Sequence, residues 1–414
     1  DDATFSPIGV NAVIGTLSST DSDSPASHTY ALVAGAGDTH NELFNIDGTT
    51  LRANDGSTLT PNTTYSVRVQ STDSDGGMFA KALSVTALWP SVQIDPSTRG
   101  WGPSIIELGG VLATGYQDIT NKFLKIVSAT SSSGLSWGTP ITVVGDGNVG
   151  DSLKLFFVEG HPAFVYYDTN LTSLRFVRAT NAAGTTWGTP VTIATGRWFN
   201  AMVVAGNPAV AYYDGAALKY VRATDATGSA WGTPITLEAS GLPAPPEIGF
   251  VIADGNPALS YALGSPQDLK YIRAADATGS AWGMSITVVD GADNTGQNNQ
   301  MTLVSGQPAI TYSNLSTGEV NFVRASDATG SAWGAPIAIT DTRSNRGHSL
   351  AFIEGKPAVA VYSLDGIDLR YHTANDALGQ TWGSAIDVDT EGSVGATPFL
   401  IENGTHPAIG YYDS

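Results

Sequence analysis

One sequence unit recurs along most of this chain, and it limits the possible folds more than any other feature. Its clearest copy, residues 205–238, reads AGNPAVAYYD, a short loop, and then LKYVRATDATGSAWGTPITLE. A tryptophan follows the same Gly-rich segment in successive copies, at intervals of 44 to 51 residues: Trp137, Trp187, Trp231, Trp282, Trp333 and Trp382. A period of this length is typical of one four-stranded blade of a β-propeller.

Each copy contains four strand-like segments. An apolar segment comes first and ends in an x-Gly turn, which suits a tight hairpin because the backbone there needs positive φ. A Pro-Ala strand, an LKYVRA-like strand and a strand after Trp-Gly follow. With 47 glycines and 21 prolines beside many Thr, Val and Tyr, the composition favours short strands over helices, so we predict an all-β chain.

The two ends of the repeat region predict how the ring closes. Residues 89–95, WPSVQID, read like a fourth strand, whereas the last copy supplies only a first strand (396–401) and a second strand (407–412). We therefore predict a β-propeller over 89–414 with about seven blades, six being the alternative count, in which strand 89–95 completes the last blade. One third strand is missing from this count. Truncation, an irregular blade, or donation by a neighbouring molecule would each explain it.

Residues 1–88 carry a different pattern, in which the strand-like segments TYALVAG and TYSVRVQ alternate with turns such as STDSDS and STDSDGG. This region resembles the cadherin-like domains of bacterial surface proteins, and the resemblance implies an immunoglobulin-like β-sandwich. It also implies a calcium site at the positions that match the family's Asp-x-Asp turns: Asp21, Asp23, Asp73 and Asp75. The family's acidic segment is replaced by Leu59–Asn62, and the alternative interpretation is Asp-rich β-turns without metal.

The hairpins between third and fourth strands resemble the Asp-box of sialidase-type propellers, with the aspartate displaced by one position (Asp225, Asp276, Asp327). In that family these hairpins are remote from the active site, so the resemblance implies fold and not activity. Arginines recur once per unit at the end of the third strand: Arg178, Arg222, Arg273 and Arg324. We interpret them as structural partners of nearby carboxylates or carbonyls.

Composition narrows the function classes. The net charge of −19 argues against nucleic acid or an anionic membrane as partner, and the lack of cysteine excludes disulfides and thiolate sites. No apolar run of membrane-spanning length occurs, which argues against membrane insertion. Because no catalytic constellation stands out, we expect the chain not to be an enzyme.

The loops before the first strand of each unit differ most between copies. They lie on one face together with the loops between second and third strands, and they predict a ligand-binding face with these candidate residues: Trp101, Trp198, Asn200, Asn298, Arg343, Arg346 and His348. We expect an extracellular or cell-surface adhesion protein that binds a glycan, a protein ligand or copies of itself. The alternatives are a structural subunit of a surface layer, sheath or filament, and a sialidase- or lyase-like glycan-active enzyme.

Overall fold

The computed structural model describes residues 3–5, 10–20, 27–60, 63–243, 247–290, 294–339, 347–364, 366–390, 393–404 and 406–413. Over these residues the chain is all-β, with two short 3₁₀ turns (η1, Asn41–Leu43; η2, Gly56–Thr58) and no α-helix. It divides into two compact units, Asp1–Gln93 and Ile94–Ser414, called unit one and unit two below.

Unit one contains two sheets. The first has the order β1 (Ala3–Phe5), β7 (Met78–Ala87), β6 (Thr64–Thr72) and β3 (Thr29–Leu32); the second has β2 (Val10–Thr16), β5 (Thr50–Asp55) and β4 (Phe44–Asp47). Along β6 every second residue is buried, as expected for a strand with one face on a core. Side chains from both sheets meet in one core that includes Phe44, Leu51, Val67 and Val85. This arrangement agrees with the predicted β-sandwich, while the cadherin-like identity stays a prediction.

Unit two consists of antiparallel sheets whose strands follow one another in sequence order. Six sheets have four strands each: β8–β11 (Gly100–Leu108, Val111–Asp118, Phe123–Ser128, Ile141–Val144), β12–β15 (Val149–Val158, His161–Asp168, Ser173–Arg178, Val191–Thr195), β16–β19 (Arg197–Val204, Asn207–Tyr213, Leu218–Arg222, Ile235–Glu238), β20–β23 (Ile248–Ala253, Asn256–Leu263, Asp268–Arg273, Ile286–Val289), β24–β27 (Gln297–Val304, Gln307–Ser313, Val320–Arg324, Ile337–Ala338) and β28–β31 (His348–Ile353, Lys356–Tyr362, Leu369–Thr373, Ile386–Asp389). A seventh sheet has two strands, β32 (Val394–Asn403) and β33 (His406–Asp413).

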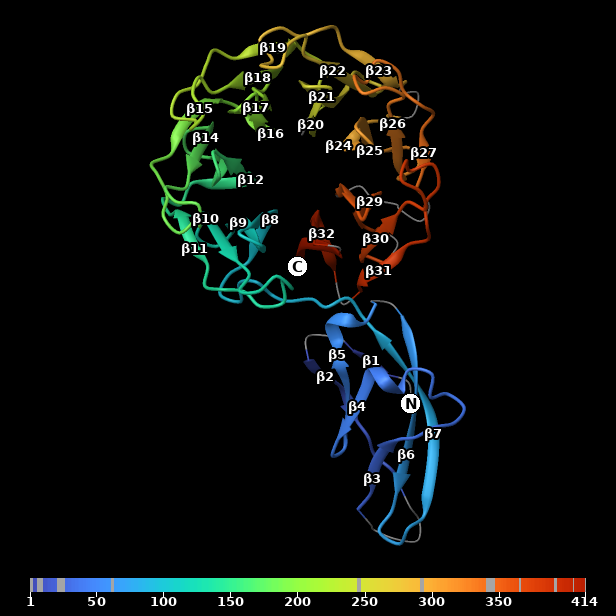
Figure 1. Ribbon diagram of the computed structural model, residues 1–414. Coiled ribbons are helices and arrows are strands. Elements are labelled where there is room, and N and C mark those ends of the chain that lie inside the picture. The colour runs from blue at the N-terminus through green and yellow to red at the C-terminus, as the bar shows by residue number, and fades with distance from the viewer. Residues whose placement is uncertain are drawn as a thin grey trace. The chain divides into compact units, whose positions relative to one another are not determined.

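The sheets are arranged around a ring (Figure 1). The first strand of each sheet contacts the first strand of the next, and β32 contacts β8, so the series closes on itself. This architecture is consistent with a β-propeller, as the repeat predicted.

The predicted strand over residues 89–95 is not formed. No strand occurs between the end of β7 at Ala87 and the start of β8 at Gly100. The physical reason lies in the seventh sheet, because fourth strands elsewhere pair with third strands, and β33 has no third strand beside it in the described part of the chain. Without that neighbour, the backbone of 89–95 has no ladder to join.

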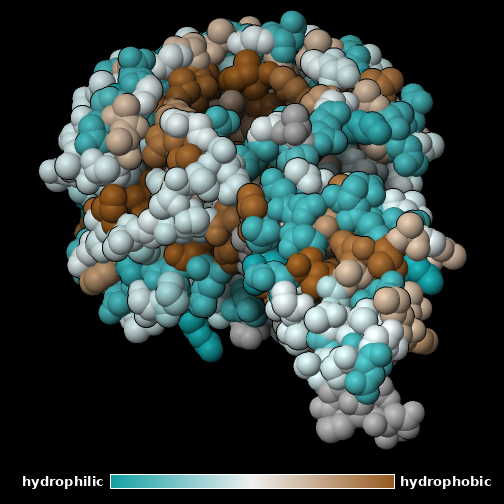
Figure 2. Space-filling view, turned by 60° about the horizontal axis from the view of Figure 1, so that its bottom comes forward, coloured by the Kyte–Doolittle hydropathy of each residue, from teal (hydrophilic) through white to brown (hydrophobic). Residues whose placement is uncertain are grey.

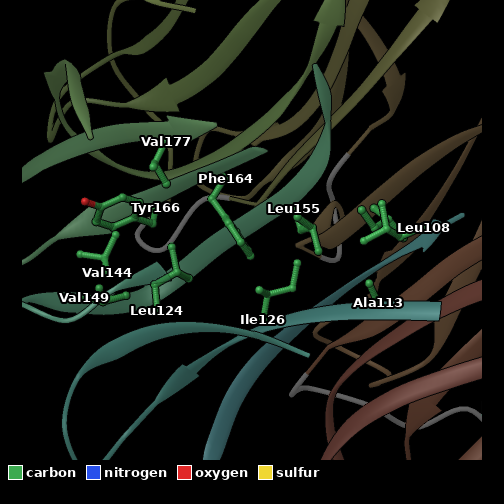
Figure 3. Packing of buried hydrophobic residues seen from close by; sticks show 11 residues of the cluster. Leu108, Ala113, Leu124, Ile126, Val144, Val149, Leu155, Phe164, Tyr166 and Val177 are labelled. Atoms are coloured by element: carbon green, nitrogen blue, oxygen red, sulfur yellow. The ribbon is translucent and has the colours of Figure 1, made fainter. Parts of the chain in front are cut away.

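The cores lie between successive sheets. Leu108 and Leu124 of the first sheet pack with Leu155, Phe164 and other buried residues of the second (Figure 3). The fit is close enough to require a glycine, because a Cβ atom on Gly115 would lie 2.2 Å from Cε1 of Phe164. Packing of this density explains how neighbouring sheets are held in a fixed arrangement.

The recurring tryptophans connect neighbouring sheets. The indole of Trp231 donates to the carbonyl of Gly228 at 3.0 Å and packs against Phe176 of the preceding sheet, with ring centroids 5.6 Å apart. Equivalent ring pairs join Tyr220 to Trp282, Tyr271 to Trp333 and Phe322 to Trp382. The hairpins therefore fasten the sheets together, which supports the interpretation that they mark the fold.

The recurring arginines bind backbone, as expected. Arg222 donates from Nε to the carbonyl of Val204 at 2.8 Å and from Nη2 to that of Ala205 at 2.7 Å. Arg178 and Arg273 bind the corresponding carbonyls of their own sheets. These side chains fix the turn between first and second strands, so the prediction of structural arginines is confirmed at these positions.

Candidate functional site

The loops that precede the first strand of each sheet lie together at one end of the ring. All first strands run in the same direction, so they all begin at the same end of the ring, where the second strands finish. We call this end the mouth; it contains the start of β8, β12, β16, β20, β24, β28 and β32. Figure 2 shows hydrophobic residues gathered around the hollow of the ring.

At the mouth, Arg197 and three aromatic rings form a continuous surface that we call the aromatic platform. The guanidinium carbon of Arg197 lies 3.7 Å from the ring centroid of Trp198 and 5.7 Å from that of Tyr167. Trp198 stacks on Tyr213 with centroids 5.9 Å apart and an interplanar angle of 29°. The platform thus joins the second and third sheets.

Local backbone geometry places Trp198 on this platform. The pairing of β16 with β17 shifts register between Arg197 and Phe199, and Trp198 has φ of +47°. A bulge of this kind turns a side chain away from the regular alternation of a strand. The side chain of Trp198, which we predicted as a ligand residue, therefore lies at the mouth and not in the regular alternation of β16 side chains.

Arg197 has no hydrogen-bond or ion-pair partner within the described residues, and it is exposed. Its contacts are with ring faces, which attract a cation electrostatically. The guanidinium N–H donors consequently remain available to a ligand.

A second ring pair lies where the seventh and first sheets meet. Trp101 of β8 and Tyr412 of β33 have centroids 5.0 Å apart at an angle of 58°. Trp101, also predicted from the sequence, is thus at the mouth but in a different pair from Trp198. Among the described residues, no ring contact links the Trp101–Tyr412 pair to the Trp198–Tyr213 pair.

The predicted asparagines are committed to internal hydrogen bonds. Asn200 donates from Nδ2 to the carbonyl of Ile248 at 2.9 Å, which ties β16 to β20. Asn298 donates from its backbone N–H to Oε2 of Glu247 at 3.2 Å and from Nδ2 to Oγ of Ser313, also at 3.2 Å. Both lie near the mouth, and both stabilise the joint between neighbouring first strands.

Glu247 is a mouth residue that the sequence did not indicate. Burial raises the pKa of its carboxyl group, against the opposing effect of the Asn298 hydrogen bond. The buried Asn299 lies beside it, donating to the Glu247 carbonyl at 2.8 Å and accepting from Ser260 Oγ at 2.6 Å. The sequence Pro-Pro-Glu carries no pattern that would single out this carboxylate.

Tyr167 and Tyr213 were also missed, although a signal was present. Each is the second Tyr of a Tyr-Tyr-Asp ending. Because strand side chains alternate, the first Tyr of each pair is buried (Tyr166, Tyr212) and the second must face the other way. This alternation could have placed both residues at the mouth.

His348 is buried and not exposed on a loop as we expected. It is the first residue of β28, with 3% of its surface exposed, and its Nε2 lies 2.9 Å from Oγ1 of Thr311. Burial lowers the pKa of His348 to about 4, so its imidazole is neutral at physiological pH. Arg343 and Arg346 lie outside the described residues.

Inside the ring, Lys154 of β12 points toward β32. Its Nζ lies 5.0 Å from the ring centroid of Phe399, and no described carboxylate forms an ion pair with it. Burial lowers the pKa of Lys154 to about 8. A lysine in this environment is a stronger nucleophile near neutral pH than an exposed one.

The predicted calcium ligands are only partly described. Asp21 and Asp23 lie outside the described residues, while Oδ1 of Asp73 accepts from the N–H groups of Asp75 at 2.9 Å and Gly77 at 2.8 Å. These bonds close the β6–β7 hairpin. The described ranges contain no cluster of three or more His, Asp or Glu residues that could hold a metal ion, and calcium binding stays a prediction.

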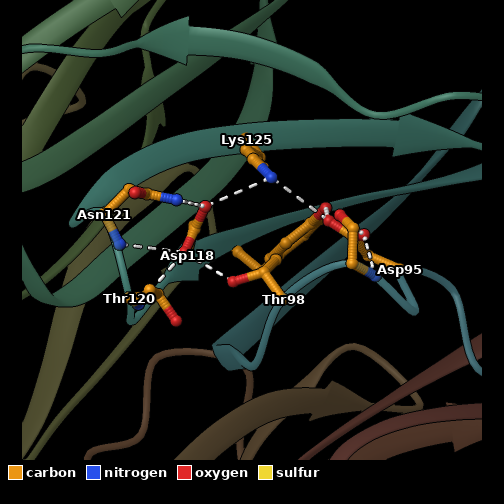
Figure 4. A network of polar contacts seen from close by, with 8 residues as sticks. Asp95, Thr98, Asp118, Thr120, Asn121 and Lys125 are labelled. Carbon is orange, nitrogen blue, oxygen red and sulfur yellow. Dashed lines mark hydrogen bonds and ion pairs between the residues drawn. The ribbon is translucent and has the colours of Figure 1, made fainter.

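Carboxylates also organise the turns between second and third strands. Asp118 accepts from the N–H groups of Thr120 and Asn121, and Lys125 Nζ lies 3.2 Å from Asp118 Oδ2 and 3.3 Å from Asp95 Oδ2 (Figure 4). Burial acts to raise the pKa of Asp118, but the hydrogen bonds from Asn121 and Thr98 and the contact with Lys125 hold it below its usual range. This cluster is structural, because its charges are paired and buried.

Comparisons with known proteins show no matching family and no matching curated sequence. Solved structures do match at low identity. A quinonprotein alcohol dehydrogenase-like protein from Bacteroides thetaiotaomicron is 10% identical, with 94% of both chains covered and a TM-score of 0.45. A puromycin-hydrolysing peptidase from Mycobacterium tuberculosis is 10% identical over 76% of this chain and 51% of its own (TM-score 0.49), and a Trypanosoma rangeli sialidase is 11% identical over 74% and 56% (TM-score 0.41).

These similarities concern the fold, yet they correct one expectation. The prediction that the chain is not an enzyme is contradicted, because the similar structures are mostly enzymes, including glycoside hydrolases and a sialidase. We withdraw that prediction. At identities of 10 to 13% these structures assign no activity to this chain.

Over the residues that the structure describes, no helix has the length and apolar character needed to cross a membrane.

Proposed function

We propose that unit two is a seven-bladed β-propeller that binds carbohydrate at the aromatic platform. The observation that carries this proposal is Arg197, which lies against the faces of Trp198 and Tyr167 with its N–H donors unused by the described residues. Sugars present apolar C–H faces beside hydroxyl groups. Aromatic rings next to a guanidinium match both features.

The wider proposal assigns the protein to the cell exterior or surface, as an adhesion protein. Unit one, as a cadherin-like domain, acts as a spacer, and calcium bound by Asp21, Asp23, Asp73 and Asp75 stiffens it. Glycan binding measured with and without a chelator separates these roles. The platform alone predicts binding that is independent of calcium.

A glycan array with purified protein tests the binding proposal. Replacing Arg197 or Trp198 by Ala should each weaken binding at least tenfold, because one removes the donors and the other the stacking surface. Met284→Ala is the matched control, since Met284 is 93% exposed and lies at the other end of its sheet from the mouth. An array without any bound glycan, or binding unchanged in both platform variants, would refute the proposal.

A second function, hydrolysis or elimination of glycans, is favoured by Glu247. Burial raises the pKa of this mouth carboxyl group, and a raised pKa is the property that suits a carboxyl group to act as general acid toward a glycosidic oxygen. Chromogenic glycosides should then be cleaved by the wild type and at least 100-fold more slowly by Glu247→Gln, with glycan binding retained. Turnover that Glu247→Gln leaves unchanged would exclude this role.

A further inference from the structure

The first strands that line the ring carry very few positive charges. As described, these seven strands contain one lysine and one arginine: Lys154 of β12 and Arg197 of β16. The two strands contact each other in the ring. In a chain with a net charge of −19, two cations on adjoining inner strands make a local region that attracts anions.

The side chain of Lys154 extends across the inner edge of the first sheet. Its Nζ lies 5.0 Å from the ring centroid of Phe399, which belongs to β32 of the seventh sheet. The strand β8 contacts both β12 and β32, so the first sheet lies between these two strands in the ring order. Because Lys154 is partly exposed, its ammonium group is accessible from the hollow of the ring (Figure 2).

Neither cation forms an ion pair with a described carboxylate. Basic residues of the third strands differ in this respect, since Lys125, Arg175 and Lys219 each pair with an aspartate of their own sheet at 3.1 to 3.3 Å. Lys154 and Arg197 lie against aromatic rings instead. The face of a ring attracts a cation but does not cancel its charge.

Two carboxyl groups of the mouth are engaged elsewhere. Oδ1 of Asp151 accepts from Ser152 Oγ at 3.4 Å, and Oε2 of Glu247 accepts from the backbone N–H of Asn298 at 3.2 Å. Asp151 is exposed, so water and salt screen its charge. Burial raises the pKa of Glu247, which favours its neutral form. An acidic group of a ligand would therefore meet two cations that these carboxyl groups do not neutralise.

Lys154 shares a sheet face with the aromatic platform. It lies opposite Val165 in the pairing of β12 with β13, and Tyr167 follows Val165 by two residues. Residues that are opposite each other, or two apart on one strand, point to the same side of a sheet. Lys154 and Tyr167 are thus neighbours on this face, and Arg197 lies over the ring of Tyr167 at 5.7 Å.

Lys154 lies deeper in the ring than the platform. The strand registers place it level with Asn200, because each residue is opposite the third residue after the proline of its second strand. Arg197 precedes Asn200 by three residues, which is no more than about 10 Å along the strand. A ligand of a few sugar units can therefore stack on the platform and reach Lys154.

We propose that the glycan bound at the aromatic platform is acidic, and that Lys154 binds the carboxylate of one of its uronic acid units. This inference rests on the proposed carbohydrate binding and adds the class of ligand. A uronic acid carries its carboxylate directly on the sugar ring, so the stacking surface and the charge are held together. Burial disfavours the charged form of Lys154, and the negative charge of a bound carboxylate stabilises it.

Titration of the intact chain with trigalacturonate and with its methyl ester tests the inference, because the ester has the same skeleton without the charge. We expect the acid to bind at least tenfold more tightly at low salt, and added salt to reduce this preference. Lys154→Met keeps an apolar stem and should remove the preference, whereas Lys154→Arg should retain it. Lys356→Met is the matched control, since Lys356 begins β29 at the other end of the ring from the mouth. Thermal unfolding checks that the variants are folded.

Trp198→Ala separates this inference from the platform proposal. It should weaken acid and ester alike, because both stack on the indole, while Lys154→Met should leave the affinity for the ester unchanged. Failure of trigalacturonate to bind, equal affinities for acid and ester, or a preference that survives Lys154→Met would overturn the inference. The platform proposal would still stand if neutral glycans bind and Trp198→Ala weakens them. Tighter binding of a sulfated galactose trisaccharide than of trigalacturonate would contradict the choice of a carboxylate.

Discussion

The phenol of Tyr220 and the indole of Trp282 meet edge to face across two sheets, with ring centroids 5.1 Å apart. The Tyr220 hydroxyl also donates to the carbonyl of Thr278 at 2.9 Å. Tyr220→Phe keeps the ring contact and removes this bond, so we expect the free energy of unfolding to fall by about 1 kcal/mol. Chemical denaturation measures the change. Tyr213→Phe, whose bond to Gly215 is exposed, is the control and should lose less.

Asp276 organises its hairpin with one side chain. Its carboxylate accepts from the N–H groups of Thr278, Ser280 and Ala281. The hydrogen bond from the Thr278 hydroxyl, together with these, holds the pKa of Asp276 below its usual range despite some desolvation. Asp276→Ala should lower stability by about 1 kcal/mol and speed amide exchange at Ala281. Asp290→Ala, at an exposed position outside any strand, should change neither.

Arg222 contributes two charge-assisted bonds to the turn that follows β16. Arg222→Ala should destabilise the protein by about 2 kcal/mol, because the carbonyls of Val204 and Ala205 lose their charged donor. Arg222→Lys should restore only part of this loss, since a lysine lacks the two-pronged geometry. Glycan binding at the platform should be unchanged in both variants, and a variant that unfolds at the wild-type denaturant concentration would contradict this role.

His348 makes stability depend on pH in a defined window. Above pH 6.5 the imidazole is neutral in both states, and between pH 6.5 and about 4 it is protonated only in the unfolded chain. Acidification through this range therefore favours unfolding, by up to about 3 kcal/mol. His348→Gln should remove this contribution, so the difference between the two stability curves should change between pH 7 and 4. Curves that stay parallel would show that His348 does not titrate in this way.

Sequence patterns predicted the repeated features well, because each depends on residues close together in the chain. The four strands of a copy, the Trp–Gly hairpin and the arginine at the end of the third strand all follow from alternation and turn chemistry. The sequence also indicated Trp198 as a residue of the variable face, because it is a tryptophan outside the recurring series, and its role in ligand binding stays a prediction. The alternation of side chains along a strand would also have predicted that Tyr167 and Tyr213 face away from the core, but our sequence analysis did not apply it to them.

Features that depend on neighbouring sheets could not be obtained in this way. Burial of His348, the hydrogen bonds that engage Asn200 and Asn298, and the raised pKa of Glu247 arise where one first strand lies beside the next. Likewise, WPSVQID has the pattern of a strand but forms none, since a strand needs a partner for its backbone groups.

The sequence by itself therefore determined the repeating sheets and the residues that hold each one together, because these contacts are local and recur with the period. Only the tertiary structure decided which side chains reach the mouth and which of them the neighbouring sheets bury. Those properties come from ring closure, which joins residues as distant as Asn403 and Ser132 and leaves no trace in any single copy of the repeat.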